Sequence, residues 1–304
     1  MPELPDVELY LWALRPRVIG RAIERVRLAS PFFVRTVEPA LALLEGRTVS
    51  ALSRIGKRLV WSLDDDLFVV VHLMIAGRLR WRERGTAIPA RLGLAAFDFA
   101  NGTLLFTEAG SRKRASLHVV RGAGALAALD PGGAEVFTIS RETFAELLRA
   151  ENHTLKRSLT DPRLFSGIGN AYSDEILHRA QLSPARLTQA MSDDEIARLF
   201  EATRAVLREW TETLQRETGD DFPEKVTAFR PGMAVHGRYG KPCPRCGAPV
   251  QRIVYASNEA NYCANCQTGG RLLADRALSR LLKEDWPKSL DDLERRRPPG
   301  PARR

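Results

Sequence analysis

Two cysteine pairs, Cys243-Pro244-Arg245-Cys246 and Cys263-Ala264-Asn265-Cys266, determine how the C-terminal part of this chain folds. Sixteen residues separate them, and they contain all four cysteines of the 304-residue chain. Four thiolates with this spacing can surround one Zn²⁺ as a tetrahedron, with a β-hairpin between the pairs. A disulfide or an iron–sulfur cluster fits the spacing and a reducing compartment less well. Because the set has no histidine, carboxylate or open position, we expect one structural zinc rather than a catalytic metal.

The segment before these cysteines is expected to be helical and contains a short glycine-rich turn. The turn reads Gly167-Ile168-Gly169-Asn170, and a helix is expected to begin at the asparagine. Backbone N–H groups at such a helix start point outward and can bind a phosphate, with the Asn170 amide as an additional donor. A tight turn between two helices that binds nothing is the alternative. Further along, Ser192-Asp193-Asp194-Glu195 is a capping box that begins a long amphipathic helix.

The first 130 residues predict one helix followed by strands. Pro5 suits the first turn of that helix, and Pro16 is expected to end or kink it. The strand-forming stretches are residues 47–63, 67–81 and 94–107. Within the last stretch, Asn101-Gly102 is typical of a hairpin turn. We expect this sheet-rich region to end at Asp130-Pro131-Gly132-Gly133.

The chain begins Met1-Pro2-Glu3, a sequence with its own chemistry. Pro2 is small enough for Met1 to be removed, which leaves a prolyl secondary amine at the end of the chain. Such an amine can attack an electrophilic carbon and form an iminium ion. The Glu3 carboxylate is one residue away and can act as its acid–base partner. The alternative is that Pro2 only guides removal of Met1 and that Pro5 only starts a helix.

Composition narrows the class of protein. The formal net charge is +9, which favours a polyanionic partner such as nucleic acid, although a basic protein without such a partner fits equally well. At 44% hydrophobic residues, the chain can form one large or two moderate domains. It has no run of 18 apolar residues and no signal-peptide pattern at its start. We therefore expect a soluble, cytoplasmic protein with no membrane partner.

Taken in order along the chain, these motifs resemble the Fpg/Nei family of bifunctional DNA glycosylases (formamidopyrimidine-DNA glycosylase and its relatives). The resemblance spans about residues 2–267. It rests on Pro2-Glu3-Leu4-Pro5-Asp6-Val7-Glu8, Gly56-Lys57-Arg58, His72-Leu73, Gly77, Gly167-Ile168-Gly169-Asn170-Ala171-Tyr172, Val235-His236-Gly237-Arg238 and both cysteine pairs.

The resemblance implies an α+β fold with an N-terminal β-sandwich and N-terminal helix, a helical helix–two-turn–helix domain, and a four-cysteine zinc β-hairpin. The expected boundaries are residues 2–130 for the catalytic sandwich, 131–230 for the helical domain, and 231–268 for the zinc finger. A helical extension over 269–290 and a disordered basic tail over 291–304 are expected to follow.

The resemblance also implies a mechanism and a partner. The Pro2 amine attacks C1′ of a damaged nucleotide, displaces an oxidised or ring-opened base, and cuts the strand by elimination from a Schiff base. Glu3 acts at the sugar ring oxygen, Lys57 contacts a phosphate near the lesion, and Gly169 and Asn170 bind another phosphate. The partner is double-stranded DNA with a damaged base or an abasic site, which requires base flipping. We expect a monomeric bacterial enzyme associated with the nucleoid.

Two segments that would fill the gap left by a flipped nucleotide depart from the family pattern. Many members read His-Leu-Gly-Met before a glycine, whereas this chain reads His72-Leu73-Met74-Ile75-Ala76-Gly77. Met74 or Ile75 is the candidate wedge, and both also fit core positions. The family's Arg-Arg-Phe-Gly is replaced by Arg112-Lys113-Arg114-Ala115-Ser116, which lacks the aromatic residue. His72, Arg112 and Arg114 remain candidate DNA contacts, with plain solvation as the alternative for the arginines.

The zinc hairpin and the residues after it depart as well. Asn258 stands five residues before Cys263, where family members commonly carry an arginine that binds phosphates, and Arg252 is a candidate to compensate for it. Leucines past the last cysteine predict a packed helix; they are Leu272, Leu273, Leu278, Leu281 and Leu282.

Two other functions stay open at this point. A damage- or structure-binding paralogue with altered catalysis agrees with Asn258 and the missing aromatic residue, although Pro2, Glu3 and Lys57 are all present. A zinc-ribbon protein of RNA metabolism would require the N-terminal motif to be a coincidence. The lesion itself is not specified, because the loop over residues 217–232 indicates flexibility and no particular base.

Overall fold

The computed structural model describes residues 1–304 except for 111, 256–257, 275–282, 284–286 and 296–304. Contacts divide the chain into two compact units. The sheet unit comprises Met1–Glu135 and Leu207–Ala228, and the helical–zinc unit comprises Val136–Val206 and Phe229–Arg304. Among the described residues, no helix is both long and apolar enough to cross a membrane.

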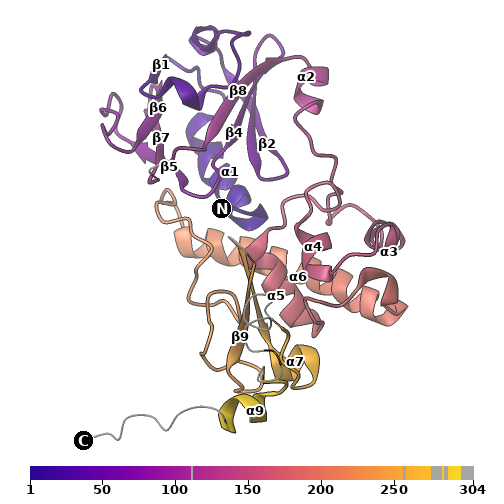
Figure 1. Cartoon of the computed structure of the whole chain (residues 1–304). Coiled ribbons are helices and arrows are strands. Elements are labelled where there is room, and N and C mark those ends of the chain that lie inside the picture. The colour runs from indigo at the N-terminus through magenta and orange to yellow at the C-terminus, as the bar shows by residue number, and fades with distance from the viewer. Residues whose placement is uncertain (111, 256–257, 275–282, 284–286, 296–304) are drawn as a thin grey trace, which may run out of the picture. The chain divides into compact units, whose positions relative to one another are not determined.

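The sheet unit contains two four-stranded antiparallel sheets, with strand orders β2-β3-β4-β8 and β1-β6-β7-β5 (Figure 1). Its elements are α1 (Leu4–Val18), β1 (Arg25–Leu28), η1 (Pro31–Phe33), η2 (Leu41–Leu44), β2 (Val49–Ile55), β3 (Arg58–Leu63), β4 (Leu67–His72), β5 (Gly77–Arg82), β6 (Gly93–Phe99), β7 (Gly102–Glu108), β8 (Ser116–Arg121) and α2 (Ala123–Ala127). Each predicted strand-forming stretch therefore consists of two strands joined by a turn.

Aromatic residues of both sheets form a shared core in the sheet unit. Trp61 on β3 meets Phe97 on β6 edge to face, with 5.8 Å between ring centroids. Side chains of α1, including Tyr10 and Leu14, belong to the same buried cluster. Such packing of two sheets over one apolar layer is a β-sandwich. The predicted N-terminal helix and sandwich are both confirmed.

Helix α1 continues past Pro16, which lies inside its last turn. Pro16 therefore does not end the helix at once, because α1 continues to Val18. The other expectation, a kink at Pro16, stays a prediction. Pro16 has no N–H to donate, and the helix closes beyond it through the Ile19 N–H, which donates to the Arg15 carbonyl at 3.2 Å. Arg17 adds support, because its guanidinium donates to the Ala13 carbonyl at 2.7 Å.

The predicted hairpin between β6 and β7 is present, with its turn shifted by one residue. Phe99 pairs with Gly102, so that Ala100 and Asn101 form the turn and Gly102 begins β7. Packing explains the glycine: a Cβ on Gly102 would lie 2.6 Å from the Trp81 ring. The glycine thus serves close contact within the sandwich rather than the turn itself.

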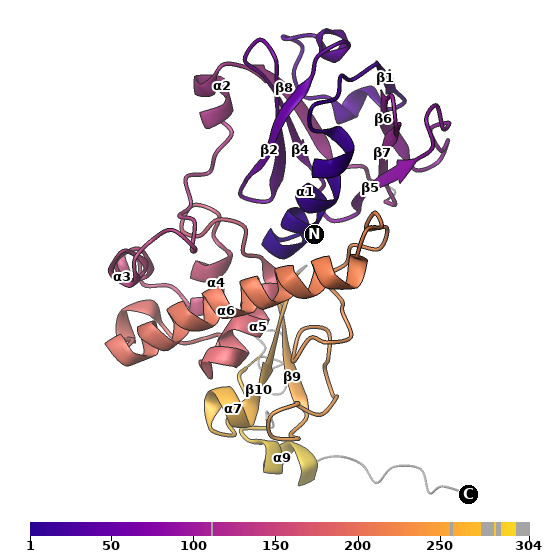
Figure 2. The same cartoon turned by 180° about the vertical axis from the view of Figure 1, so that it is seen from behind.

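The helical–zinc unit contains short helices and the C-terminal hairpin. Its elements are α3 (Arg141–Arg149), α4 (Leu155–Thr160), α5 (Asn170–Ala180), η3 (Thr188–Ala190), the start of α6 (Asp193–Thr218), β9 (Val250–Tyr255), β10 (Asn258–Cys263), α7 (Ala264–Thr268) and α9 (Leu290–Arg295). Figure 2 shows α6 as one uninterrupted helix. Its predicted capping box is confirmed, because the Ser192 N–H donates to Glu195 at 2.9 Å and the Glu195 N–H donates to the Ser192 hydroxyl at 3.2 Å.

The residues after the zinc hairpin are only partly described. Leu272 and Leu290 are buried in one cluster with Ile253 and Tyr262 of the hairpin. The Leu273 N–H donates to the Tyr262 hydroxyl at 2.8 Å. Three leucines of the predicted extension helix, at positions 278, 281 and 282, lie outside the described residues, as does most of the predicted tail. The described part of the extension therefore packs on the hairpin.

Candidate active site, phosphate-binding turn and metal centre

Pro2 and Glu3 lie buried at the start of α1. Glu3 is only 2% exposed, and its backbone N–H donates to the Asp6 carboxylate at 2.9 Å. The Glu3 carboxylate accepts the Asp6 backbone N–H in return, which completes a capping box. This box fixes the direction in which the chain enters α1. The two residues before the helix are therefore held in place rather than frayed.

The environment of the chain-terminal amine favours its neutral form. In this structure the amine belongs to Met1, and burial is the main cause that lowers its pKa. Glu3 acts in the opposite direction, while the charges of Arg78 and Lys57 lower the pKa further. An amine whose pKa is lowered is more often unprotonated near neutral pH and is a better nucleophile. Sequence reasoning missed Arg78, because only the fold brings β5 close to the N-terminus.

Lys57 lies on a tight turn between β2 and β3. Ile55 pairs with Arg58, so Gly56 and Lys57 alone form the turn. Gly56 has φ +58°, a value that glycine adopts without strain. Next to the turn, Arg54 donates to Glu8 of α1 at 2.8 Å. This ion pair ties the lysine turn to the helix that begins at Glu3.

The turn between β4 and β5 presents Ile75 rather than Met74. Ile75 is 61% exposed, whereas Met74 is half-buried and has φ +52°. Gly77 closes the turn through its N–H, which donates to the Leu73 carbonyl at 2.9 Å. A Cβ on Gly77 would overlap that carbonyl, so the position requires glycine. Of the two candidate wedge residues, Ile75 is the one at the surface.

His72, at the end of β4, is neutral at physiological pH. Burial lowers its pKa to about 4, and the charges of Arg58, Lys57 and His118 act in the same direction. A neutral imidazole can donate one hydrogen bond to a phosphate but brings no charge. Its expected role as a DNA contact is therefore restricted to a hydrogen bond.

The arginines of the loop before β8 are exposed, and a buried carboxylate holds the base of this loop. Glu108, which is 2% exposed, accepts the backbone N–H of Arg114 at 2.8 Å and that of Ala115 at 3.1 Å. Arg112 and Arg114 have exposed side chains. Sequence reasoning missed Glu108, since nothing in the local sequence links it to the loop.

The predicted phosphate-binding turn leads into α5, with Gly169 at the N-cap position. The Ser173 hydroxyl donates to the Gly169 carbonyl at 2.5 Å. The ammonium group of Lys156 donates to the Asn170 carbonyl at 2.6 Å, which fixes the first residue of the helix. The N-terminus of a helix favours an anion. Asn170 is only partly buried.

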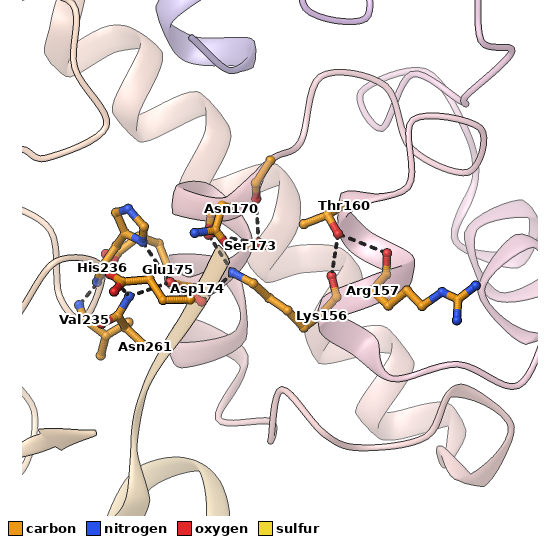
Figure 3. A network of polar contacts seen from close by, with 12 residues as sticks. Lys156, Arg157, Thr160, Asn170, Ser173, Asp174, Glu175, Val235, His236 and Asn261 are labelled. Carbon is orange, nitrogen blue, oxygen red and sulfur yellow. Dashed lines mark hydrogen bonds and ion pairs between the residues drawn. The ribbon is translucent and has the colours of Figure 1, made fainter. Parts of the chain in front are cut away.

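A buried carboxylate on α5 connects this turn to the residues before the zinc hairpin (Figure 3). The Asp174 side chain is fully buried and accepts from Lys156 at 2.5 Å. It also accepts from Nδ1 of His236 at 2.8 Å and from the Asn261 amide at 3.2 Å. One side chain thus joins α4, α5, the segment around His236, and β10.

Glu175, the neighbouring residue, is not a surface glutamate. Its carboxylate accepts the backbone N–H groups of Ala234, Val235 and His236 at 2.7 to 2.9 Å. Burial raises its pKa, although these three N–H groups act against that rise. Glu175 therefore holds the backbone of residues 234–236 against α5.

The four cysteines form one cluster around a common centre. Their Sγ atoms all lie within 4.8 Å of one another. The described cysteines are free thiols, and the pKa of Cys263 is raised to about 11 by burial and by its thiol neighbours. A divalent cation at the centre would relieve this crowding of thiolates, and four sulfurs suit tetrahedral zinc. His178 of α5 supports the cluster, because its Nε2 is 3.3 Å from the Cys243 Sγ.

Asn258, where family members commonly have an arginine, lies in the hairpin formed by β9 and β10. Asn258 begins β10 opposite Tyr255. Arg252 of β9 is 42% exposed at its side chain, pairs with Glu259 at 3.5 Å, and lies 4.7 Å from the centre of the Tyr239 ring. Its proposed compensation for Asn258 stays a prediction.

A β-sandwich that starts with a buried prolyl-glutamyl pair, together with a helical module and a four-cysteine finger, defines the class of zinc-containing DNA-repair glycosylases. Family models match in the same order along the chain. The formamidopyrimidine-DNA glycosylase N-terminal domain matches residues 1–115, and the H2TH domain of the same enzyme matches 128–220. The zinc finger found in FPG and IleRS matches 240–269.

Known proteins agree with these matches. The formamidopyrimidine-DNA glycosylase of Thermus thermophilus is 35% identical over 280 residues, which cover 89% of this chain and all of that protein. The chain therefore belongs to the formamidopyrimidine-DNA glycosylase family. An uncharacterised formamidopyrimidine-DNA glycosylase-like protein of Mycobacterium tuberculosis is 40% identical over 151 residues, which cover 50% of this chain and 94% of that protein.

Solved structures show the same fold. The MutM (Fpg) protein of Thermus thermophilus superposes with a TM-score of 0.73 at 33% identity, covering 88% of this chain and 98% of that one. Lactococcus lactis Fpg bound non-covalently to DNA with an abasic site gives a TM-score of 0.76 at 26% identity, covering 88% and 99%. The predicted α+β fold and the single structural zinc are confirmed as family features.

Proposed function

We propose that this chain excises an oxidised or ring-opened base from double-stranded DNA and then cuts the strand as an abasic-site lyase. The observation that carries this proposal is the chain-terminal amine, whose pKa is lowered by burial and by Arg78 and Lys57 and which lies beside the buried Glu3. Removal of Met1 would transfer that environment to the secondary amine of Pro2. Membership in the glycosylase family supports the substrate class.

The chemistry follows from these groups. The lone pair of the Pro2 nitrogen forms a bond to C1′ while the bond from C1′ to the base breaks, and the departing base takes up a proton. The C1′–O4′ bond then opens to give an iminium ion, and Glu3 delivers the proton that O4′ requires. Loss of a proton from C2′ expels the 3′ phosphate and breaks the strand. Hydrolysis of the iminium ion returns the free amine.

Cations and one apolar residue of the sheet unit would hold the DNA near this chemistry. Lys57, carried by the β2–β3 turn, supplies a charge for a phosphate next to the lesion. Ile75 is the apolar side chain that projects from the β4–β5 turn, and it would occupy the space of the flipped nucleotide. Arg112 and Arg114 are exposed and available for the DNA backbone or the base opposite the lesion. A net charge of +9 favours this partner as a whole.

The helical–zinc unit would bind the phosphate backbone of the DNA. The Gly169–Asn170 turn offers the N-terminus of α5 to a phosphate, and Lys156 holds the Asn170 backbone in place. When zinc is bound, it holds Cys243, Cys246, Cys263 and Cys266 together, which fixes the hairpin that carries Asn258. The Lactococcus lactis relative was solved with abasic-site DNA, which supports this partner for the family fold.

A panel of labelled duplexes tests the proposal. Each duplex carries one lesion or an abasic site, and base release and strand cleavage are scored separately with protein whose Met1 is shown by mass spectrometry to be absent. We expect base release from at least one oxidised or ring-opened base, and cleavage at the abasic site. Damage-specific binding without either reaction would instead identify a damage-binding paralogue. Absence of both binding and reaction would overturn the proposal.

A further inference from the structure

A cavity in the helical–zinc unit combines an aromatic ring with cations and plays no part in the chemistry above. It has a volume of about 430 Å³ and is lined by Phe229, Arg230, Pro231, His236, Gly237, Arg238 and Lys241. This volume is in the range of sites that bind small molecules. We call it the Phe229 cavity.

The ring of Phe229 forms a stacking surface. Phe229 is 66% exposed, and it stacks on the buried His236 with 5.4 Å between ring centroids and an interplanar angle of 22°. Gly237 leaves room for this arrangement, because a Cβ there would lie 2.6 Å from the Phe229 ring. A phenylalanine supported on one face and exposed over most of its surface can accept a second flat ring.

The support beneath Phe229 is rigid. Nδ1 of His236 is bound to Asp174 at 2.8 Å, and Lys156 and Asn261 hold the same carboxylate (Figure 3). Glu175 accepts the His236 backbone N–H at 2.9 Å. Both the imidazole ring and its backbone are thus fixed before any ligand arrives, so stacking on Phe229 would lose little conformational entropy in the support.

The remaining lining residues are suited to an anion. The Arg238 side chain donates to the Pro242 carbonyl at 3.3 Å, and its Nε has no hydrogen-bond partner. Within the described part of the chain, neither Arg238 nor Lys241 forms an ion pair with a carboxylate. Arg230 adds a third cation to the lining. Cations beside an exposed aromatic ring are the pattern by which proteins bind the phosphate and base of a single DNA strand.

We propose that the Phe229 cavity binds one unpaired nucleotide of a DNA strand, with the base stacked on Phe229 and the phosphate held by Arg238 and Lys241. The inference rests on the proposed function only in taking DNA as the ligand. It adds a further contact to DNA, outside the chemistry at Pro2.

The test uses the zinc-loaded full chain and a short, dye-labelled oligothymidine, with binding followed by fluorescence anisotropy. Phe229→Ala should weaken binding about 5- to 100-fold, the range for loss of one base–aromatic stack. Phe229→Tyr should retain binding. Phe32→Ala is the matched control, because Phe32 is 80% exposed but belongs to the sheet unit. Lys241→Gln should lower the slope of log affinity against log salt by about 0.7, the value for one phosphate contact on a single strand.

Equal affinities for Phe229→Ala and Phe32→Ala would overturn the inference. Binding of thymidine 5′-monophosphate that depends on Phe229, without such dependence for the oligonucleotide, would also overturn it by indicating a free-nucleotide site. Borohydride trapping on an abasic duplex is measured with the same variants. Intact trapping with unchanged oligonucleotide binding rejects this inference alone, whereas a wild-type chain that cannot be trapped rejects the proposed function. Unchanged zinc content in Phe229→Ala shows that the unit has folded.

Discussion

Replacement of Asp174 by alanine should destabilise the helical–zinc unit strongly and selectively. The Asp174 side chain is fully buried, and its partners Lys156 and His236 are 13% and 4% exposed at their side chains. Removing one member of a buried ion pair leaves the other charge without compensation, at a cost of about 3–5 kcal/mol. With a urea dependence of about 1–3 kcal/mol per M, the unfolding midpoint should fall by about 2 M.

The two units can be followed separately in a urea titration. Four of the five tryptophans, at positions 12, 61, 81 and 210, belong to the sheet unit, so tryptophan fluorescence reports mainly on that unit. Release of zinc to a coloured chelator reports on the helical–zinc unit. We expect Asp174→Ala to shift the zinc-release midpoint and to leave the fluorescence midpoint nearly unchanged. The exposed Asp194 provides the control, because Asp194→Ala should cost less than about 1 kcal/mol.

A double-variant cycle examines the reason for the loss. Asp174→Ala leaves the Lys156 ammonium group without its carboxylate partner, and Lys156→Met removes that ammonium group. The double variant should therefore recover part of the stability that Asp174→Ala loses. A coupling of about 1–3 kcal/mol is expected for residues in direct contact. If Asp174→Ala shifts the zinc-release midpoint no more than Asp194→Ala does, the network in Figure 3 does not stabilise the unit and the reasoning is refuted.

Three further predictions concern the pH response, the wedge and the metal. The pKa of His72 is lowered to about 4 in the folded chain, so the unfolded chain takes up a proton at this residue at a higher pH than the folded chain does. The free energy of unfolding should therefore fall by about 3 kcal/mol from this residue as the pH drops from about 6.5 to 4. His72→Gln should make the urea midpoint of the sheet unit depend less on pH over that range, and an unchanged pH dependence would contradict the prediction. Ile75→Ala should weaken binding to an abasic duplex about 5- to 30-fold through lost apolar burial, while Met74→Gly, which relieves a positive φ, should change it less than twofold; the reverse order would assign the wedge to Met74. Cys246→Ser should reduce zinc well below one per chain in a metal analysis of purified protein, and full retention of zinc would argue against a four-thiolate site.

Features carried by short, contiguous patterns could be predicted from the sequence. The cysteine spacing predicts the zinc hairpin, and the capping box at Ser192 predicts the start of α6, because the groups that interact there are close along the chain. The end of α1 could not be placed in this way. A proline does not by itself show how many helical residues follow it, and α1 continues past Pro16 to Val18.

Features that depend on long-range contacts were out of reach. Arg78 influences the terminal amine, and Glu108 holds the arginine loop, only after strands distant in sequence come together. Asp174 and His236 are 62 residues apart, and nothing in either local sequence indicates that they are partners. The exposure of Ile75 over Met74 likewise follows from the geometry of one turn. The predicted domain boundaries and DNA-contact residues remain predictions.

The most direct test of the account is to locate the covalent bond. Protein lacking Met1 is incubated with an abasic duplex and sodium borohydride, the trapped complex is digested, and the modified peptide is sequenced by mass spectrometry. The account predicts a reduced sugar remnant on the nitrogen of Pro2. A remnant on Lys57, or no covalent complex when Met1 is shown to be absent, would contradict the claim that the buried N-terminal amine is the nucleophile.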